Sequence, residues 1–197
     1  MNDDSASPDF WSSRYVAGRM PWDLQGVPPA LEEFLRQTPS RGHVLIPGCG
    51  SGYEVRAFHE AGFQVTAIDF SSGAIQRARD VLGSLAEKVR LGDFFVYDFA
   101  DRPFDLIYER TFLSSLAPSR WPDYARRMAE LLKPRGKLVG IFIYGHEPDP
   151  PPFPLSEEPA RKMFANAFRL TRNELLPNSL PVFAGMEERW QEWTRLA

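Results

Sequence analysis

Hydrophobic residues along this chain follow two periodicities. Short apolar runs, typical of buried strands, occupy residues 43–46, 63–68, 88–91, 104–108 and 137–144, and two last strands are expected at 168–175 and 190–196. Apolar residues three or four positions apart predict helices at 30–37, 53–61, 71–82, 121–132 and 156–166. Because strands that alternate with helices are joined by right-handed crossovers, we expect an α/β fold with a mostly parallel sheet.

The N-terminal part of the chain does not follow this alternation. Residues 1–9 are polar and predict a loose tail, whereas residues 10–29 are rich in aromatic residues, proline and glycine. Such a segment resists helix and sheet formation and often forms a shaped loop over a site. The length of the chain suits one compact domain. We therefore expect a single domain at 10–197 with an aromatic lid at 10–29.

Composition places the chain among ordinary globular proteins. Of its 197 residues, 43% are hydrophobic and 25% are charged, and the formal net charge is −3. This mildly acidic balance argues against binding to a nucleic-acid backbone. The polar, acidic start differs from a signal peptide, no apolar run has the length of a membrane span, and the single cysteine allows no intrachain disulfide. We expect a cytoplasmic protein that binds neither nucleic acid nor a membrane.

The most informative motif is the glycine-rich turn after the first expected strand. Gly48, Gly50 and Gly52 stand at alternate positions between this strand and the following helix. Glycines at such a turn let the backbone bend sharply and let a ligand lie against the main chain. A dinucleotide-binding turn would have its third glycine at Tyr53, whereas the Gly-x-Gly-x-Gly form is typical of S-adenosylmethionine sites. The alternative is a turn that only joins strand to helix.

Acidic residues follow the next two expected strands. Asp69 ends the second strand, where a carboxylate can accept hydrogen bonds from both hydroxyls of a ribose; its alternative role is helix capping with Ser71. Asp93 and Phe94 follow the third strand and suit the amino group and ring face of an adenine, although an aspartate there can also simply form a turn. Ligands of open α/β sheets bind at the carboxyl ends of the strands, so the three strand ends together predict an adenosine site.

Further motifs are spread over the chain from about residue 10 to residue 196. They are Phe10-Trp11-x-x-Arg14-Tyr15-x-x-Gly18-x-x-Pro21-Trp22-Asp23, the loop at 44–52, Phe104-Asp105-Leu106-Ile107-Tyr108-Glu109-Arg110, Leu131-Leu132-Lys133-Pro134-x-Gly136-x-Leu138-Val139 and Pro151-Pro152-Phe153-Pro154-Leu155. Together they resemble the thiopurine S-methyltransferase family, which includes plant thiol and halide methyltransferases. Two positions depart from the family pattern: Tyr15, where tryptophan is frequent, and Ser114-Ser115, which replaces Cys-Ala near the expected acceptor pocket.

The resemblance implies a Rossmann-like, seven-stranded sheet with helices on both faces, and a monomeric enzyme whose cofactor is S-adenosylmethionine. It implies methyl transfer to a small thiol, hydrosulfide, halide or other soft nucleophile. The residues that it assigns to the cofactor lie in the lid and at the strand ends: Trp11, Tyr15, Trp22, Gly48, Asp69, Asp93, Phe94 and Arg110. Gly50 belongs to the same cofactor loop, and we expect Cys49 to pack there against the cofactor and not to act as a nucleophile.

The side chains expected to carry the chemistry follow the fourth strand. A guanidinium at Arg110 would favour the anionic form of an acceptor and lower the pKa of a thiol. A general base is then not strictly required, because thiols are partly ionised near neutral pH. Glu109 is a candidate base or, alternatively, an ion-pair partner for an arginine. His43, His59 and His146 lack the spacing of metal ligands, and we expect no metal site.

Three other functions stay open on the sequence. The same cofactor could serve methyl transfer to oxygen or nitrogen of a small metabolite, or the chain could bind it without turnover as an interaction module. A nicotinamide-dependent dehydrogenase is disfavoured by Tyr53. A screen of methyl acceptors separates the first two functions from the thiol methyltransferase.

Overall fold

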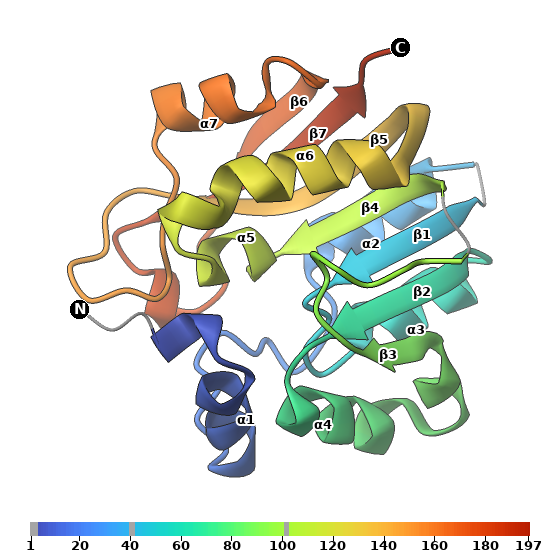
Figure 1. The fold of residues 1–197 in the computed structure, drawn as a ribbon, viewed down its shortest axis with the longest axis vertical. Coiled ribbons are helices and arrows are strands. Elements are labelled where there is room, and N and C mark those ends of the chain that lie inside the picture. Colours follow the sequence, from blue (N-terminus) through green and yellow to red (C-terminus); the bar gives the residue numbers. More distant parts are fainter. Residues whose placement is uncertain (1–3, 40–41, 101–102) are drawn as a thin grey trace. The chain divides into compact units, whose positions relative to one another are not determined.

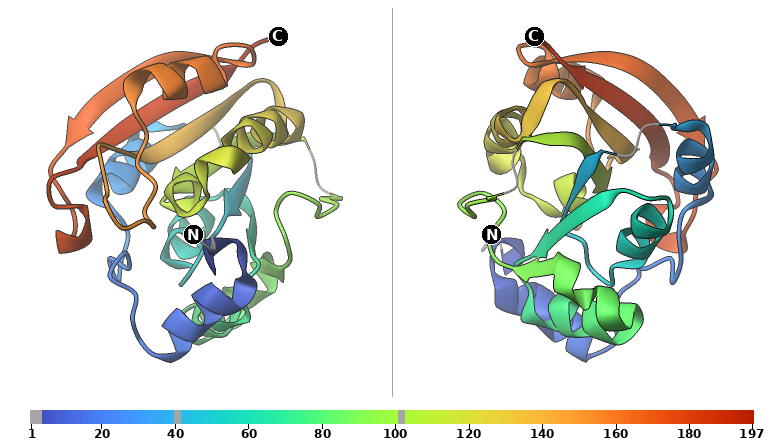
Figure 2. Two further views of the ribbon diagram at one scale, coloured as in Figure 1. Left: turned by 60° about the vertical axis from the view of Figure 1, so that its left-hand side comes forward. Right: turned by 90° about the vertical axis from the view of Figure 1, so that its right-hand side faces the viewer.

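A computed structural model describes residues 4–39, 42–100 and 103–197. The chain divides into two compact units, at 1–98 and 99–197, and each unit contains strands with helices packed against them (Figures 1 and 2). Within the described residues there are seven strands, as expected. The single domain that we expected over residues 10–197 stays a prediction.

The first unit is built on three parallel strands in the order β3-β2-β1. Their bounds are β1 (His43–Pro47), β2 (Gln64–Asp69) and β3 (Val89–Leu91). Every residue of β1 is buried, as are four consecutive residues of β2, which explains why both read as continuous apolar runs. The parallel register brings the carboxyl ends of the three strands to one edge.

Three helices of this unit agree with the apolar periodicity. They are α2 (Pro29–Gln37), α3 (Tyr53–Glu60) and α4 (Ser72–Leu82), and a 3₁₀ segment, η2 (Gly83–Lys88), leads from α4 into β3. The predicted cap of α4 is confirmed, because Ser71 Oγ accepts a hydrogen bond from the backbone N–H of Ala74 at 3.1 Å. Its buried face includes Ala74, Ile75, Ala78 and Leu82; the expected inward residue Val81 is only half-buried.

A helix that we did not predict opens the chain. Residues 4–9, expected to be a loose tail, contain a 3₁₀ turn, η1 (Asp4–Ala6), and the start of α1 (Pro8–Val16). Ser7 caps α1 by accepting from the backbone N–H of Asp9 at 3.2 Å, and Pro8 occupies its first turn. The Ser-Pro-Asp sequence is a helix-start signal that the high aromatic and proline content of the following residues obscured.

The second unit contains a mixed sheet in the order β4-β5-β7-β6. Its strands are β4 (Phe104–Arg110), β5 (Leu132–Tyr144), β6 (Phe168–Leu176) and β7 (Glu187–Arg195). β4 and β5 are parallel, whereas β7 pairs antiparallel with both β5 and β6. β5 begins five residues before the expected residue 137, and its pairing with β4 shifts register between Phe104 and Leu106.

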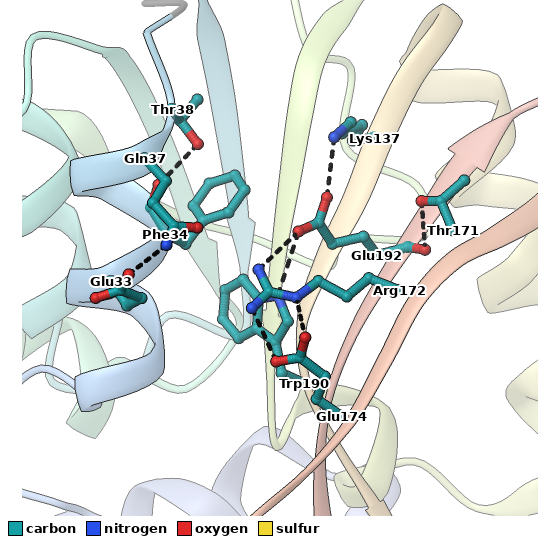
Figure 3. A network of polar contacts seen from close by, with 10 residues as sticks. All are labelled: Glu33, Phe34, Gln37, Thr38, Lys137, Thr171, Arg172, Glu174, Trp190 and Glu192. Atoms are coloured by element: carbon teal, nitrogen blue, oxygen red, sulfur yellow. Dashed lines mark hydrogen bonds and ion pairs between the residues drawn. The ribbon is translucent and has the colours of Figure 1, made fainter.

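Helices of the second unit pack on this sheet and on one another. They are α5 (Phe112–Ser115), α6 (Trp121–Leu131) and α7 (Glu157–Phe164), with 3₁₀ turns η3 (Pro118–Arg120) and η4 (Pro181–Phe183). The expected inward face of α6 is confirmed, since Tyr124, Met128 and Leu131 are buried. Across the β5–β7–β6 surface, Glu192 accepts from Lys137 Nζ at 2.9 Å and lies 3.4 Å from Arg172 Nη1 (Figure 3).

Candidate cofactor site

The glycine-rich turn connects β1 directly to α3. Gly48, Gly50 and Gly52 all have positive φ angles, of 58°, 52° and 80°, which L-amino acids with side chains rarely adopt. The backbone N–H of Cys49 donates to the carbonyl of Ile68 at 3.1 Å, so the turn is joined to the end of β2. The sequence pattern at 48–52 is therefore a consequence of backbone geometry.

Asp69 joins the glycine-rich turn to the start of α4. One carboxylate oxygen accepts the backbone N–H of Gly50 at 3.0 Å, and the other accepts that of Ser71 at 2.9 Å. Burial raises the pKa of Asp69 to about 6, and the hydrogen bonds from Ser71 and Gly50 oppose this rise. The capping role that we considered for Asp69 is thus present. Since each carboxylate oxygen has two acceptor positions, these contacts leave capacity for further donors.

The end of β3 is joined to the same edge. The backbone N–H of Gly92 donates to the carbonyl of Asp69 at 3.0 Å. Asp93 is exposed, and one of its carboxylate oxygens accepts the backbone N–H of Phe95 at 2.8 Å, so it also forms the turn that we considered. Phe94 is 4% exposed and packs edge-on against Phe95. The three strand ends of the first unit are therefore connected by backbone hydrogen bonds.

Aromatic side chains of the lid pack against one another, and one of them, Tyr15, reaches the glycine-rich turn. Trp22 packs edge-on against Trp11 and Tyr15, with ring centroids 5.3 Å and 6.0 Å apart. A Cβ atom at Gly50 would lie only 2.7 Å from the hydroxyl oxygen of Tyr15. The Tyr15 ring therefore reaches the turn in the space that a side chain at 50 would fill. Burial, followed by the nearby Asp69 charge, raises the pKa of this tyrosine.

Two side chains that sequence reasoning did not select attach the lid to this edge. Ser12 of α1 contacts the hydroxyls that begin α4, and Asp23 accepts a hydrogen bond from Ser51 Oγ of the glycine-rich turn at 2.7 Å. Asp23 is part of the Pro21-Trp22-Asp23 motif, which was a usable signal. Ser12 carried none, because its role depends on the unpredicted helix α1.

Cys49 lies in the centre of the turn and is buried. Burial raises the pKa of its thiol well above the ordinary range, and Asp69 and Glu54 add to the rise. The thiol is therefore neutral near pH 7, which argues against a nucleophilic role. Its packing against a cofactor stays a prediction.

The two residues expected to carry the chemistry belong to the second unit. Glu109 is 1% exposed, and its carboxylate accepts the backbone N–H of Leu113 at 3.0 Å and the hydroxyl of Tyr124 at 2.7 Å. Burial raises the pKa of Glu109 to about 7 against these two hydrogen bonds. Arg110 is half-buried at the end of β4 and precedes Thr111, whose φ of 61° marks a sharp turn. The contribution of both residues to the reaction stays a prediction.

Two features of the described residues bear on other functions. No group of three or more His, Cys, Asp or Glu side chains among them is placed to hold a metal ion. His43 instead has its Nε2 atom 2.9 Å from the hydroxyl of Thr66. None of the helices in these residues has the length and apolar character needed to cross a membrane.

Comparisons with known proteins identify the family of the chain. The model of the thiopurine S-methyltransferase family matches residues 6–195. Probable thiol methyltransferase 2 of Arabidopsis thaliana is 32% identical over 92% of this chain and 84% of its own. Thiopurine S-methyltransferase of Vibrio cholerae is 28% identical over 80% of each chain.

Solved structures show the same fold. The 1,6-didemethyltoxoflavin-N1-methyltransferase of Burkholderia thailandensis, solved with 1,6-didemethyltoxoflavin and S-adenosylhomocysteine, superimposes with a TM-score of 0.76 at 19% identity, over 96% of this chain and 87% of that one. The fold is thus the α/β fold of class I methyltransferases. The chain belongs to the thiopurine S-methyltransferase family and is an S-adenosylmethionine-dependent methyltransferase.

Proposed function

We propose that this enzyme methylates a small thiol or another soft anion, and that its cofactor binds where β1, β2 and β3 end. The observation that carries the proposed site is the meeting of Gly50, Asp69 and Tyr15. The backbone N–H of Gly50 donates to the Asp69 carboxylate, and the aromatic ring of Tyr15 brings its hydroxyl next to the same glycine. The names of the relatives, a thiol methyltransferase and a thiopurine S-methyltransferase, support the acceptor class.

The residues at this edge fit the chemistry of an adenosyl sulfonium. The Asp69 carboxylate would accept from ribose hydroxyls, and Asp93 and Phe94 would contact the adenine. Gly48, Cys49 and Gly50 would let the ligand lie against the main chain. When bound, the cofactor supplies a methyl group activated by a positively charged sulfur. Because Gly50 has no side chain, the Tyr15 hydroxyl can approach the turn, which supports the placement of an aromatic lid at this site.

The lid residues Trp11, Tyr15 and Trp22 would serve the sulfonium in two ways. Aromatic faces attract a cation by roughly 0.5–2 kcal/mol, depending on how much water is excluded. The same rings would keep water from the reacting atoms. Holding the acceptor and the methyl group in line can contribute on the order of 7–11 kcal/mol, so positioning is the larger effect.

Arg110 is proposed to stabilise the anionic acceptor. A guanidinium beside a thiol lowers the pKa of the thiol and favours the thiolate, which is the reactive form. Because the thiolate has already lost its proton, methyl transfer needs no separate general base. Glu109 has both carboxylate oxygens engaged by Leu113 and Tyr124 and is almost fully buried. These contacts support a role in holding the turn after β4, and not a role as the base.

The test of the cofactor site is a binding measurement. In calorimetry, Asp69→Ala should weaken binding of S-adenosylmethionine at least tenfold, which corresponds to about 1.4 kcal/mol. Asp80 is an exposed residue of α4 whose carboxylate accepts a hydrogen bond from Gln76. Asp80→Ala is the matched control and should bind the cofactor as wild type does. Because Asp69 also orders the backbone at Gly50 and Ser71, thermal melting of each variant checks that the unit remains folded. Wild-type affinity in a folded Asp69→Ala variant would contradict the site.

The test of the acceptor class is a transfer assay with cofactor labelled in its methyl group. We expect transfer to thiols, hydrosulfide, thiocyanate or iodide. Arg110→Ala should lower kcat/KM for a thiol at pH 7 by tenfold or more and shift the rate profile to higher pH. Transfer only to catechols or amines would show that the methyl acceptor is oxygen or nitrogen and not sulfur. Retained cofactor binding without any transfer would indicate a binding protein.

The proposal also includes a cytoplasmic, monomeric enzyme that takes its acceptor from solution. The single cysteine and the net charge of −3 support it, because the charge does not favour nucleic acid or an anionic membrane surface. Cell fractionation and light scattering of the purified protein test these two properties.

A further inference from the structure

The lid, defined here as residues 8–25, carries the three aromatic side chains between two polar attachments to the first unit. One attachment joins α1 to α4, which lie side by side in Figure 1, and the other joins the segment after Trp22 to the glycine-rich turn. Tyr15 lies in sequence between the two and reaches Gly50. Any role of this lid in cofactor exchange rests on the proposed cofactor site, which lies at the same turn.

The first attachment is the contact of Ser12 with the first turn of α4. Ser12 Oγ lies 3.1 Å from Ser71 Oγ and 3.3 Å from Ser72 Oγ, and it accepts the backbone N–H of Gly73 at 3.4 Å. A Cβ atom at Gly73 would lie 2.8 Å from the carbonyl oxygen of Ser12 and 2.9 Å from Cβ of Tyr15. The backbone of α1 therefore rests directly on Gly73, in the same contact that places Tyr15.

The second attachment is the hydrogen bond from Ser51 Oγ to Asp23 Oδ2, at 2.7 Å. The other oxygen of Asp23 accepts the backbone N–H of Gln25 at 2.7 Å, so the carboxylate is oriented by its own loop. Ser51 is 6% exposed and belongs to the glycine-rich turn itself. Because Asp23 directly follows Trp22, this bond fixes the indole relative to the turn.

Burial alone does not hold the lid. No residue of α1 is fully buried, although Phe10, Trp11 and Tyr15 are partly buried, and a helix of this length is marginal in water without tertiary contacts. Elements with few buried apolar contacts open locally at a small fraction of the global unfolding free energy. Because burial holds the lid only weakly, the polar contacts at its two attachments determine how often the lid opens.

We propose that Ser12 and Asp23 are positioning residues that hold the aromatic lid on the cofactor loop and set the rates at which S-adenosylmethionine enters and S-adenosylhomocysteine leaves. Neither residue touches the reacting atoms. Ser12 acts through Tyr15, and Asp23 acts through Trp22 and Ser51.

The experiment measures dissociation of S-adenosylhomocysteine by stopped-flow tryptophan fluorescence, since Trp11 and Trp22 report on the lid. Asp23→Ala and Ser51→Ala should each raise the dissociation rate at least fivefold. The double variant should be no faster than Asp23→Ala, because both substitutions remove the bond between Ser51 and Asp23. Asp23→Asn keeps its amide oxygen as acceptor for the N–H of Gln25, and its NH2 group can donate to Ser51 Oγ, which can also accept, so it should restore a rate within twofold of wild type. Ser12→Ala should also raise the rate.

Ser13→Ala is the matched control for Ser12→Ala. Its hydroxyl donates to the carbonyl of Phe10 within α1, so the wild-type rate is expected. Additive effects of Asp23→Ala and Ser51→Ala, or rates within twofold of wild type for Asp23→Ala and Ser12→Ala, would overturn the inference. If those rates are unchanged while Asp69→Ala still weakens binding at least tenfold, the role of the attachments is contradicted and the proposed cofactor site is not. If wild-type protein binds neither cofactor form, the proposed site itself fails.

Discussion

Glu109 shows how much a residue's surroundings change its chemical role. The sequence places a carboxylate beside Arg110 at the end of a strand, which suits either a base or an ion-pair partner. In the fold, the carboxylate is buried and accepts from the N–H of Leu113 and the hydroxyl of Tyr124, so it links β4 to α5 and α6. A buried, doubly hydrogen-bonded carboxylate is better suited to fixing a turn than to collecting a proton from a substrate.

Replacement of Glu109 by glutamine separates these roles. A glutamine amide can accept from Leu113 with its oxygen and donate to the Tyr124 hydroxyl, so the turn should persist. We expect kcat/KM of Glu109→Gln for a thiol to stay within about threefold of wild type, because no proton transfer is lost. A general base contributes about 10²–10⁴-fold, so a loss of that size in steady-state assays would assign the base role to Glu109.

At the scale of elements, the pairing of β4 with β5 depends on one glycine. Gly140 is the register partner of Glu109 and has a φ of 152°. A Cβ atom there would lie 1.8 Å from the carbonyl oxygen of Glu109, which is backbone and cannot rotate away. The end of β4, which carries Glu109 and Arg110, is therefore positioned by a close backbone contact between the two strands.

Gly140→Ala should consequently separate the two strands. We expect a loss in the free energy of unfolding of about 3 kcal/mol or more, measured by urea titration, because neither backbone can relieve the overlap locally. Gly26→Ala is the control: its Cβ would meet nothing within 4 Å, and a change within about 0.5 kcal/mol is expected. Equal stability of the two variants would contradict the role assigned to Gly140.

At the scale of the whole molecule, the two units each bury an acidic group whose pKa is raised. Burial raises the pKa of Asp69 from 3.8 to about 6 and that of Glu109 from 4.5 to about 7. In both cases the folded chain holds its proton more tightly than the unfolded chain does. Their contribution to stability is therefore fully present below about pH 4 and is lost as the pH rises through 6 and 7.

This linkage predicts how Glu109→Gln changes stability with pH. The variant should match wild type near pH 4.5 and become more stable by on the order of 2 kcal/mol at pH 8, because the amide has no charge to desolvate. Urea unfolding of both proteins between pH 4.5 and pH 8 measures the difference. A variant that is less stable than wild type by the same amount at every pH would show that the carboxylate is not strained by burial.

The sequence by itself determined the strands, most of the helices and the glycine-rich turn, because buried runs, helical periodicity and positive φ angles restrict which residues can occupy those positions. It also selected Asp69 and the aromatic residues, whose contact with the cofactor stays a prediction, and its motifs resembled the correct family. Only the tertiary structure decided that Ser12 and Asp23 attach the lid and that Tyr124 encloses Glu109. The attachments of the lid join residues at least 28 positions apart, so no local pattern encodes these contacts, whereas the start of α1 did carry a local signal in its capping serine and the following proline.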